Sequence, residues 1–187
     1  MREIDRPPLH LVAPSLELLP QYEAALAAGW SPDTERDVSA EQLAAARRDP
    51  GGFFAELTRQ DGVILLASGQ YVPRLPSQVF WIDDGDFCGA ISLRYDPGTD
   101  ALPSYVSGHI GYAVVPWKRN RGYATEALRL MLDEARAVGL DYVEITAKPG
   151  NPASHKVITA NGGRLVDRFF EDAAYGGAES LKFRIDL

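Results

Sequence analysis

The stretch PWKRNRGYATEALRLMLDEA, Pro116 to Ala135, decides the fold. It begins with a basic loop (residues 116–122) that carries one glycine, and it continues as a regular amphipathic segment. Apolar residues of this segment recur every three or four positions, which is the spacing of a helix with one buried face. They are Ala127, Leu128, Met131, Leu132 and Ala135. We therefore predict that the basic loop leads directly into a core helix.

The start of this helix has the features of an anion site. Backbone N–H groups at a helix N-terminus point outward and carry partial positive charge. Gly122 lacks a β-carbon and Ala124 has a small side chain, so an oxygen-rich group can approach the backbone closely. Arg119 and Arg121 add full charges at the rim. Two interpretations stay open: a cradle for two linked phosphates, or a solvated loop ahead of a core helix.

The rest of the chain reads as a mixed α/β (α+β) domain with one main sheet. Hydrophobic patterns predict strands at Leu9–Ala13, Gln78–Ile82, Phe87–Tyr95, Gly108–Val115, Tyr142–Ala147, Leu165–Phe170 and Leu181–Ile185. Further helices are expected between Ser15 and Trp30, over Ala40–Arg48, at Phe53–Thr58 and over Pro152–Asn161. Ser39 and Gln42 resemble a capping box, and Asp49 to Gly52 should end the second helix. The aromatic residues expected in the core are Trp30, Phe80, Trp81, Phe169 and Phe170.

Composition narrows the class of protein. The 187 residues fit a single domain over 1–187, and the formal net charge of −7 argues against nonspecific binding to nucleic acid. No apolar run reaches the roughly 18–20 residues that a membrane span needs. Cys88 is the one cysteine, so no internal disulfide can form, and the three histidines give no metal-ligand cluster. We expect a cytoplasmic protein without a metal and without a membrane partner.

Two short motifs, taken together, resemble a known family. Arg119-Asn-Arg-Gly122-Tyr-Ala124 is similar to the pattern Arg/Gln-x-x-Gly-x-Gly/Ala of the GNAT superfamily of acyl-CoA-dependent N-acyltransferases. Asn151-Pro-Ala-Ser154 is similar to a second element of that family, which opens a short helix. The resemblance runs from about Phe80 to the C-terminus. It implies a mostly antiparallel central sheet with flanking helices and one splayed pair of parallel strands, Gly108–Val115 and Tyr142–Ala147.

The resemblance also implies an activity. The protein would be an N-acetyltransferase that moves an acetyl group from acetyl-CoA to a primary amine by direct attack in a ternary complex. The acceptor would be a small-molecule amine or an exposed amino group, and a homodimer is compatible with this interpretation. By the same resemblance, the residues expected to bind the cosubstrate are Ala113, Val114, Val115, Arg119, Asn120, Arg121, Gly122, Tyr123, Ala124, Thr125, Asn151 and Ser154.

The catalytic groups are less directly indicated. Many family members use a Tyr to protonate the leaving CoA thiolate, but the matching position here is Ile158, which cannot donate. Ser154 is the nearest replacement for the acid, although it would serve equally well as a helix cap. His109 titrates near neutrality and is a candidate base, with a structural role as the alternative and Glu144 and Glu126 as weaker candidates. The absent Tyr keeps a second hypothesis open, a non-catalytic acyl-CoA sensor.

The acceptor site has the weakest sequence signal. We expect the acceptor to be bound by the first two helices and by three loops, Tyr71–Gln78, Asp96–Ser107 and Asp172–Glu179. Acidic residues in and near these segments, among them Asp84, are compatible with binding of a cation or with ordinary solvation.

Overall fold

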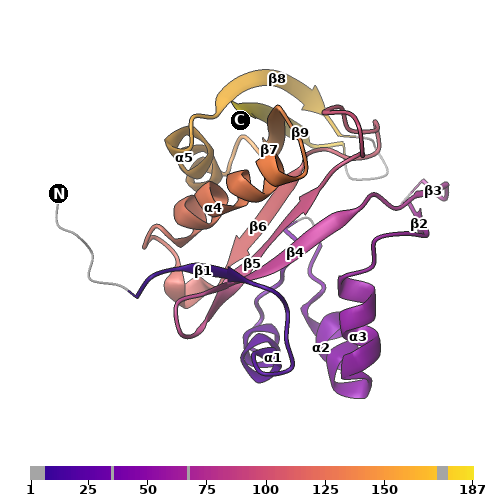
Figure 1. Ribbon diagram of the computed structural model, residues 1–187, viewed down its shortest axis with the longest axis vertical. Coiled ribbons are helices and arrows are strands. Elements are labelled where there is room, and N and C mark those ends of the chain that lie inside the picture. The colour runs from indigo at the N-terminus through magenta and orange to yellow at the C-terminus, as the bar shows by residue number, and fades with distance from the viewer. Residues whose placement is uncertain (1–6, 35, 67, 172–176) are drawn as a thin grey trace. The chain divides into compact units, whose positions relative to one another are not determined.

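A computed structural model gives the fold, and it describes residues 7–34, 36–66, 68–171 and 177–187. Helices and strands follow one another as drawn in Figure 1. In chain order they are β1 (His10–Val12), α1 (Leu19–Ala27), α2 (Ser39–Arg48), α3 (Pro50–Leu57), β2 (Val63–Leu65), β3 (Tyr71–Pro73), β4 (Ser77–Asp83), β5 (Phe87–Arg94), β6 (Ile110–Val114), η1 (Pro116–Lys118), α4 (Tyr123–Ala137), β7 (Tyr142–Ala147), α5 (Pro152–Ala160), β8 (Arg164–Phe170) and β9 (Glu179–Asp186).

The chain divides into two units, each of which is described by itself. The first consists of Met1–Thr58, Val79–Ser92 and Tyr112–Leu130. The second consists of Arg59–Gln78, Leu93–Gly111 and Met131–Leu187. Four elements contribute residues to both units, namely β4, β5, β6 and α4. The prediction of a single domain over the whole chain stays a prediction.

The first unit is built around an aromatic core. Helices α1, α2 and α3 lie together on one side of strands β1 and β4 (Figure 1), and β1 pairs antiparallel with β4. Tyr22 of α1 stacks on Trp81 of β4, with 4.8 Å between ring centroids. It also makes edge contacts with Trp30 at 5.6 Å and Phe87 at 5.4 Å. Trp30 and Trp81 are each 1% exposed, which confirms their predicted place in the core.

The starts of α2 and α3 differ from the prediction. Ser39 is the first residue of α2 rather than its cap, and the capping position, Val38, makes no side-chain hydrogen bond. The capping-box prediction was wrong because Gln42 uses its side-chain oxygen to accept the Tyr22 hydroxyl instead. Helix α2 ends at Arg48 with Asp49 as its C-cap, as expected, and Asp49 also caps α3 by accepting the N–H of Gly52 at 3.0 Å. A proline at the first position of α3 suits that start.

The second unit contains two antiparallel sheets. Strands β7, β9 and β8 pair in that order, with Glu144 opposite Arg184 and Ala147 opposite Leu181. Strands β2 and β3 form a two-stranded sheet that was not predicted, because each is only three residues long. Strand β8 pairs on one side with β9 and is otherwise largely exposed. Phe170 at its end is 74% exposed, so its prediction as a core residue was wrong.

These elements confirm the predicted fold class, a mixed α/β architecture with antiparallel sheets. Strand order in the four-stranded sheet is β1-β4-β5-β6. The splayed parallel strand pair stays a prediction. Within the described part of the chain, none of the helices has both the length and the apolar character needed to span a membrane.

Candidate functional site

The basic loop between β6 and α4 is exposed and has a distinctive backbone. It opens with the short 3-10 helix η1, and residues 119–122 then lead into α4. Asn120 has a φ of 60° and Gly122 a φ of 81°, so two of these four residues are left-handed. Glycine adopts this conformation freely, and asparagine tolerates it better than most residues. The residue types at positions 120 and 122 are therefore those that the turn requires.

The start of α4 adds positive potential next to this loop. Its first helical hydrogen bond runs from the N–H of Glu126 to the carbonyl of Gly122 over 3.0 Å. The N-terminal end of a helix carries partial positive charge from its first N–H groups. Arg119 and Arg121 are both exposed and lie just ahead of that end. An anion is favoured here, and two linked phosphates suit an exposed loop with left-handed turns.

The end of β6 is tied to this loop and to β5. Ala113, Val114 and Val115 are all buried. Arg119 donates from Nε to the carbonyl of Val114 over 3.1 Å. Val115 donates its N–H to the carbonyl of Cys88 and accepts the N–H of Lys118, each over 3.0 Å. Both main-chain groups of Val115 are therefore engaged within the protein, and its predicted contact with the cosubstrate stays a prediction.

A buried ionic cluster lies beside the loop and was missed in the sequence. Asp84, in the turn between β4 and β5, receives Lys118 Nζ at 2.5 Å on Oδ1 and the Tyr123 hydroxyl on Oδ2. Burial alone would raise the pKa of Asp84, but the hydrogen bonds from Lys118 and Tyr123 outweigh it and lower the pKa to about 2. Asp84 is therefore an ionised residue paired within the protein, whereas the sequence left open whether it binds an acceptor cation or is solvated.

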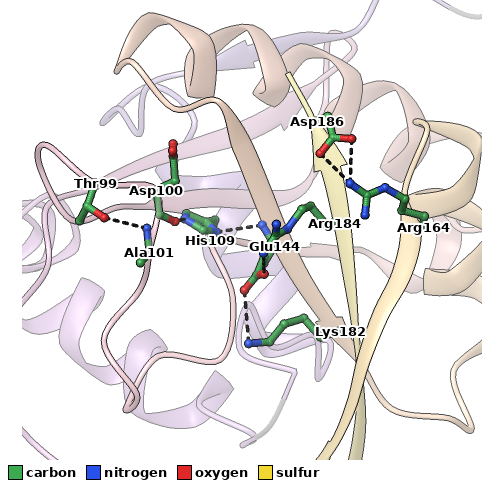
Figure 2. Close-up of polar contacts among 9 residues, drawn as sticks. All are labelled: Thr99, Asp100, Ala101, His109, Glu144, Arg164, Lys182, Arg184 and Asp186. Atoms are coloured by element: carbon green, nitrogen blue, oxygen red, sulfur yellow. Dashed lines mark hydrogen bonds and ion pairs between the residues drawn. The ribbon is translucent and has the colours of Figure 1, made fainter.

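His109 in the second unit is buried and held by the main chain on both sides. Its Nδ1 accepts the N–H of Glu144 over 2.9 Å, so Nε2 carries the proton and donates to the carbonyl of Asp100 over 3.1 Å (Figure 2). His109 is only 1% exposed. Burial lowers the pKa of His109, and the nearby charge of Glu144 opposes this without outweighing it. These contacts favour a neutral, structural imidazole.

The carboxylate of Glu144 is engaged by two cations of β9. Arg184 approaches Oε1 at 2.7 Å and Lys182 approaches Oε2 at 3.3 Å (Figure 2). Arg184 also lies 3.8 Å from the centroid of the Tyr142 ring. Burial alone would raise the pKa of Glu144, but the hydrogen bond from Arg184 and the charge of Lys182 lower the pKa by more than burial raises it. The net shift is therefore downward. A carboxylate stabilised in this way is a poor proton acceptor.

The second motif forms the start of α5. Asn151 is the capping residue, and its Oδ1 accepts the N–H of Ser154 over 3.1 Å. Capping by Asn151, rather than by Ser154, differs from the sequence-based expectation. Ser154 lies in the first turn of α5 and is partly exposed. Ile158, the position where many family members carry Tyr, is fully buried on the same helix.

The predicted residues therefore fall into two groups. The basic loop, the end of β6 and the start of α4 belong to the first unit, whereas His109, Asn151 and Ser154 belong to the second. Residues 172–176 of the predicted acceptor segment lie outside the described residues. Among the residues that the structure describes, no group of three or more His, Cys, Asp or Glu side chains is arranged to hold a metal ion.

Comparisons of the chain with known proteins identify its family. The family of the acetyltransferase (GNAT) domain matches residues 30–164. RimJ of Mycobacterium smegmatis, in complex with a CoA disulfide, is 22% identical with a TM-score of 0.65, over 97% of this chain and 84% of that one. The microcin C7 self-immunity acetyltransferase MccE, in complex with acetyl-CoA and AMP, is 11% identical with a TM-score of 0.64, over 98% and 93% of the two chains.

A third similar structure is the Salmonella typhimurium acetyltransferase that modifies the N-terminal serine of ribosomal protein L7/L12. It is 15% identical with a TM-score of 0.64, over 96% of this chain and 95% of that one. A search of curated proteins gave no match. At these identities the solved structures show a shared fold, whereas the family match covers more than half of the chain, including the basic loop. The chain is an acyltransferase and belongs to the GNAT acetyltransferase family.

Proposed function

We propose that this protein transfers an acetyl group from acetyl-CoA to a primary amine by direct attack within a ternary complex. The observation that carries the proposal is the exposed basic loop, left-handed at Asn120 and Gly122, that ends at the N-terminus of α4. Such a loop offers backbone N–H groups and two arginines to a diphosphate. Similar structures bind the expected cosubstrate, since MccE was solved with acetyl-CoA and RimJ with a CoA disulfide.

Residues of this loop fit the nucleotide end of the cosubstrate. Arg119 and Arg121 supply counter-charge, and Gly122 permits close approach of phosphate oxygens to the backbone. Tyr123, Ala124 and Thr125 form the first turn of α4, where an anion is stabilised by the helix dipole. We assign the diphosphate of CoA to this end of the helix.

When bound, acetyl-CoA supplies an acetyl group activated as a thioester. Its carbonyl oxygen gains charge as the amine attacks, and we propose that the main-chain N–H of Val114 donates to it. The departing sulfur needs a proton, and we propose Ser154 as the donor. For His109 we propose positioning rather than proton transfer, because both ring nitrogens are engaged by main-chain groups. After the attack the nitrogen loses a proton to water, and water returns a proton to the Ser154 oxygen, so the serine hydroxyl is restored.

The acceptor class follows from the chemistry of the family. Direct attack on a thioester requires a nitrogen with a free lone pair, and the acceptor we propose is a primary amino group on a small molecule or at the exposed end of a chain. The similar Salmonella enzyme modifies the N-terminal serine of a ribosomal protein. We therefore include short peptides with free N-termini among the acceptors to be tested.

One observation favours a second function. Ile158 is buried at the position where many family members carry a proton-donating Tyr. A chain without that acid can still hold acyl-CoA, so the alternative is a non-catalytic acyl-CoA sensor. Its predicted signature is tight binding of CoA with no transfer.

Release of CoA thiol separates the two functions. The full chain is incubated with acetyl-CoA and a panel of small amines and peptides, and the free thiol is followed over time. Cys88 is buried and burial raises its pKa to about 12, so the native protein adds little background to this assay. Thiol release that depends on one class of amine supports the transferase. Tight CoA binding in calorimetry, with no release across the panel, supports the sensor.

A further inference from the structure

The side chain of Asp84 points inward from a turn that would ordinarily face water. Asp84 follows β4 directly, and its side chain is only 7% exposed. Neighbouring Asp86, in the same turn, is exposed. Burying a carboxylate is costly unless it is paired and hydrogen-bonded, so the position of Asp84 requires partners.

Those partners lie on either side of residues 119–122 of the basic loop. Lys118, 2.5 Å from Oδ1 of Asp84, is the last residue of η1. Tyr123, whose hydroxyl donates to Oδ2, is the first residue of α4. Between them lie residues 119–122, which hold the two left-handed positions and the two exposed arginines. One carboxylate therefore fastens both ends of the segment that is proposed to bind diphosphate.

The charge of Lys118 is paired with the carboxylate of Asp84. Its side chain is 13% exposed, and Nζ also lies 3.3 Å from Cys88 Sγ and 5.7 Å from the centroid of the Tyr123 ring. Arg119 and Arg121, in contrast, are exposed. The three basic residues of the loop thus divide into one largely buried cation, Lys118, and two exposed arginines, of which Arg119 also donates to the carbonyl of Val114.

Left-handed backbone at a non-glycine residue costs free energy and persists where the surroundings hold it. Asn120 lies two residues after Lys118 and three residues before Tyr123, so both anchors act close to it. We propose that Asp84 is a positioning residue for the diphosphate-binding loop: it fixes Lys118 and Tyr123 so that residues 119–122 are held in the binding conformation before the cosubstrate arrives. This inference rests on the proposed function of the loop.

The first experiment compares two neighbouring aspartates. Asp84→Asn removes the charge that holds Lys118, and Asp86→Asn removes a charge from the exposed part of the same turn. CoA binding to each full-length variant is measured by calorimetry at a temperature where circular dichroism shows both folded. We expect Asp84→Asn to raise the Kd for CoA about tenfold and Asp86→Asn to change it less than about twofold.

A truncated substrate distinguishes positioning from general damage. S-acetylpantetheine keeps the thioester and lacks the phosphates and the nucleotide, so it cannot use the basic loop. For Asp84→Asn we expect an unchanged kcat/KM with S-acetylpantetheine and a raised KM with acetyl-CoA. An equal loss with both substrates would mean that Asp84 supports the fold in general, and it would overturn the proposal.

The direction of the change excludes a rival role for Lys118. If Lys118 bound phosphate itself and Asp84 merely competed for its charge, Asp84→Asn would tighten CoA binding. Tightening would overturn the proposal, as would an unchanged Kd. If Asp84→Asn does not fold, Tyr123→Phe removes only the hydroxyl anchor and should raise the Kd for CoA about threefold, and an unchanged Kd in that folded variant would overturn the proposal.

Failure of the inference differs from failure of the proposed function. Wild-type protein that binds no CoA at all would contradict the proposed function. Wild-type protein that binds CoA, together with an Asp84→Asn variant of equal affinity, would leave the function standing and would contradict only the role of Asp84.

Discussion

His109 and Glu144 are joined by two hydrogen bonds that run in opposite directions. The main-chain N–H of His109 donates to the carbonyl of Glu144 over 2.7 Å. The main-chain N–H of Glu144 donates in return to Nδ1 of His109 over 2.9 Å. The ring therefore connects Glu144 of β7 to Asp100, whose carbonyl accepts from Nε2 (Figure 2). Protonation of Nδ1 would remove the second of these bonds.

The first prediction concerns pH. The pKa of His109 in the folded protein is lowered by burial, so the unfolded chain takes up a proton on this side chain at a higher pH than the folded chain does. The stabilisation from neutral His109 is therefore full above about pH 6.5 and decreases as the pH falls below that value. Urea unfolding between pH 8 and pH 5 should show this loss in the wild type and a smaller one in His109→Asn.

The same variant tests catalysis. Asparagine places an oxygen near the position of Nδ1, so it can still accept the N–H of Glu144 while lacking a group that titrates near neutrality. We expect His109→Asn to keep kcat within about threefold, whereas loss of a general base costs about 10²-fold or more. A folded variant that loses activity to that extent would restore His109 as the base.

The second prediction concerns acid stability at Asp84. Its pKa is about 2 in the folded protein, below the ordinary value for an aspartate. The ionised carboxylate, held by Lys118 and Tyr123, therefore contributes above about pH 4, and this contribution of about 2 kcal/mol is lost as the pH falls towards 2. Unfolding free energies of wild type and Asp84→Asn should converge over that range. Asp86→Asn is the matched control and should follow the wild type.

The third prediction concerns the thiol of Cys88. Burial raises its pKa to about 12, and the side chain is fully enclosed. Because thiolate is the reactive form, iodoacetamide at pH 8 should leave Cys88 unmodified in the native protein and label it fully in urea. Rapid labelling of native protein, detected by mass spectrometry, would show that the enclosure around Cys88 opens readily.

The fourth prediction concerns Gly122. Valine at this position would be strained at a φ of 81° and would place methyl groups where phosphate oxygens are proposed to bind. We expect Gly122→Val to raise the Kd for CoA more than about 100-fold, with a melting temperature lower by only a few degrees. Gly98→Val carries a similar strain, at a φ of 85°, outside the loop and is the control. Unchanged CoA affinity in folded Gly122→Val would argue against the diphosphate site.

The fifth prediction concerns the contact between β5 and β6. A β-carbon on Gly89 would lie 2.2 Å from the carbonyl oxygen of Ala113, and the φ of Gly89 is 147°. We expect Gly89→Ala to destabilise the protein by about 3 kcal/mol or more, because both atoms in the clash are fixed by backbone. Gly98→Ala, where nothing lies within 4 Å of the added carbon, should cost only about 1 kcal/mol. Chemical denaturation of both variants measures the difference.

The sequence predicted the elements whose signals are local. Helix α4 was expected from its apolar spacing, and β7 was predicted with the bounds that the structure shows. Strands β4 and β5 were predicted to within one residue at each end from their apolar segments. Three-residue strands such as β2 and β3 carry too few positions for a periodic pattern, so they were missed.

Side-chain pairings were harder to predict because they join residues far apart in the sequence. Gln42 looked like part of a capping box, yet its partner is Tyr22 on another helix. Asp84 was compatible with cation binding or with ordinary solvation, yet it pairs with Lys118, 34 positions away. No spacing rule connects such residues, since the contact exists only after the chain has packed.

By itself, the sequence determined the order of the main helices and strands, the basic loop and the family, because periodicity, glycine placement and short motifs act over neighbouring residues. Only the tertiary structure decided that Asp84 faces inward to Lys118 and Tyr123, and that both nitrogens of His109 are engaged. The physical reason is that burial and pairing fix the charge and the hydrogen bonds of a titratable group, and both depend on residues brought together from distant parts of the chain.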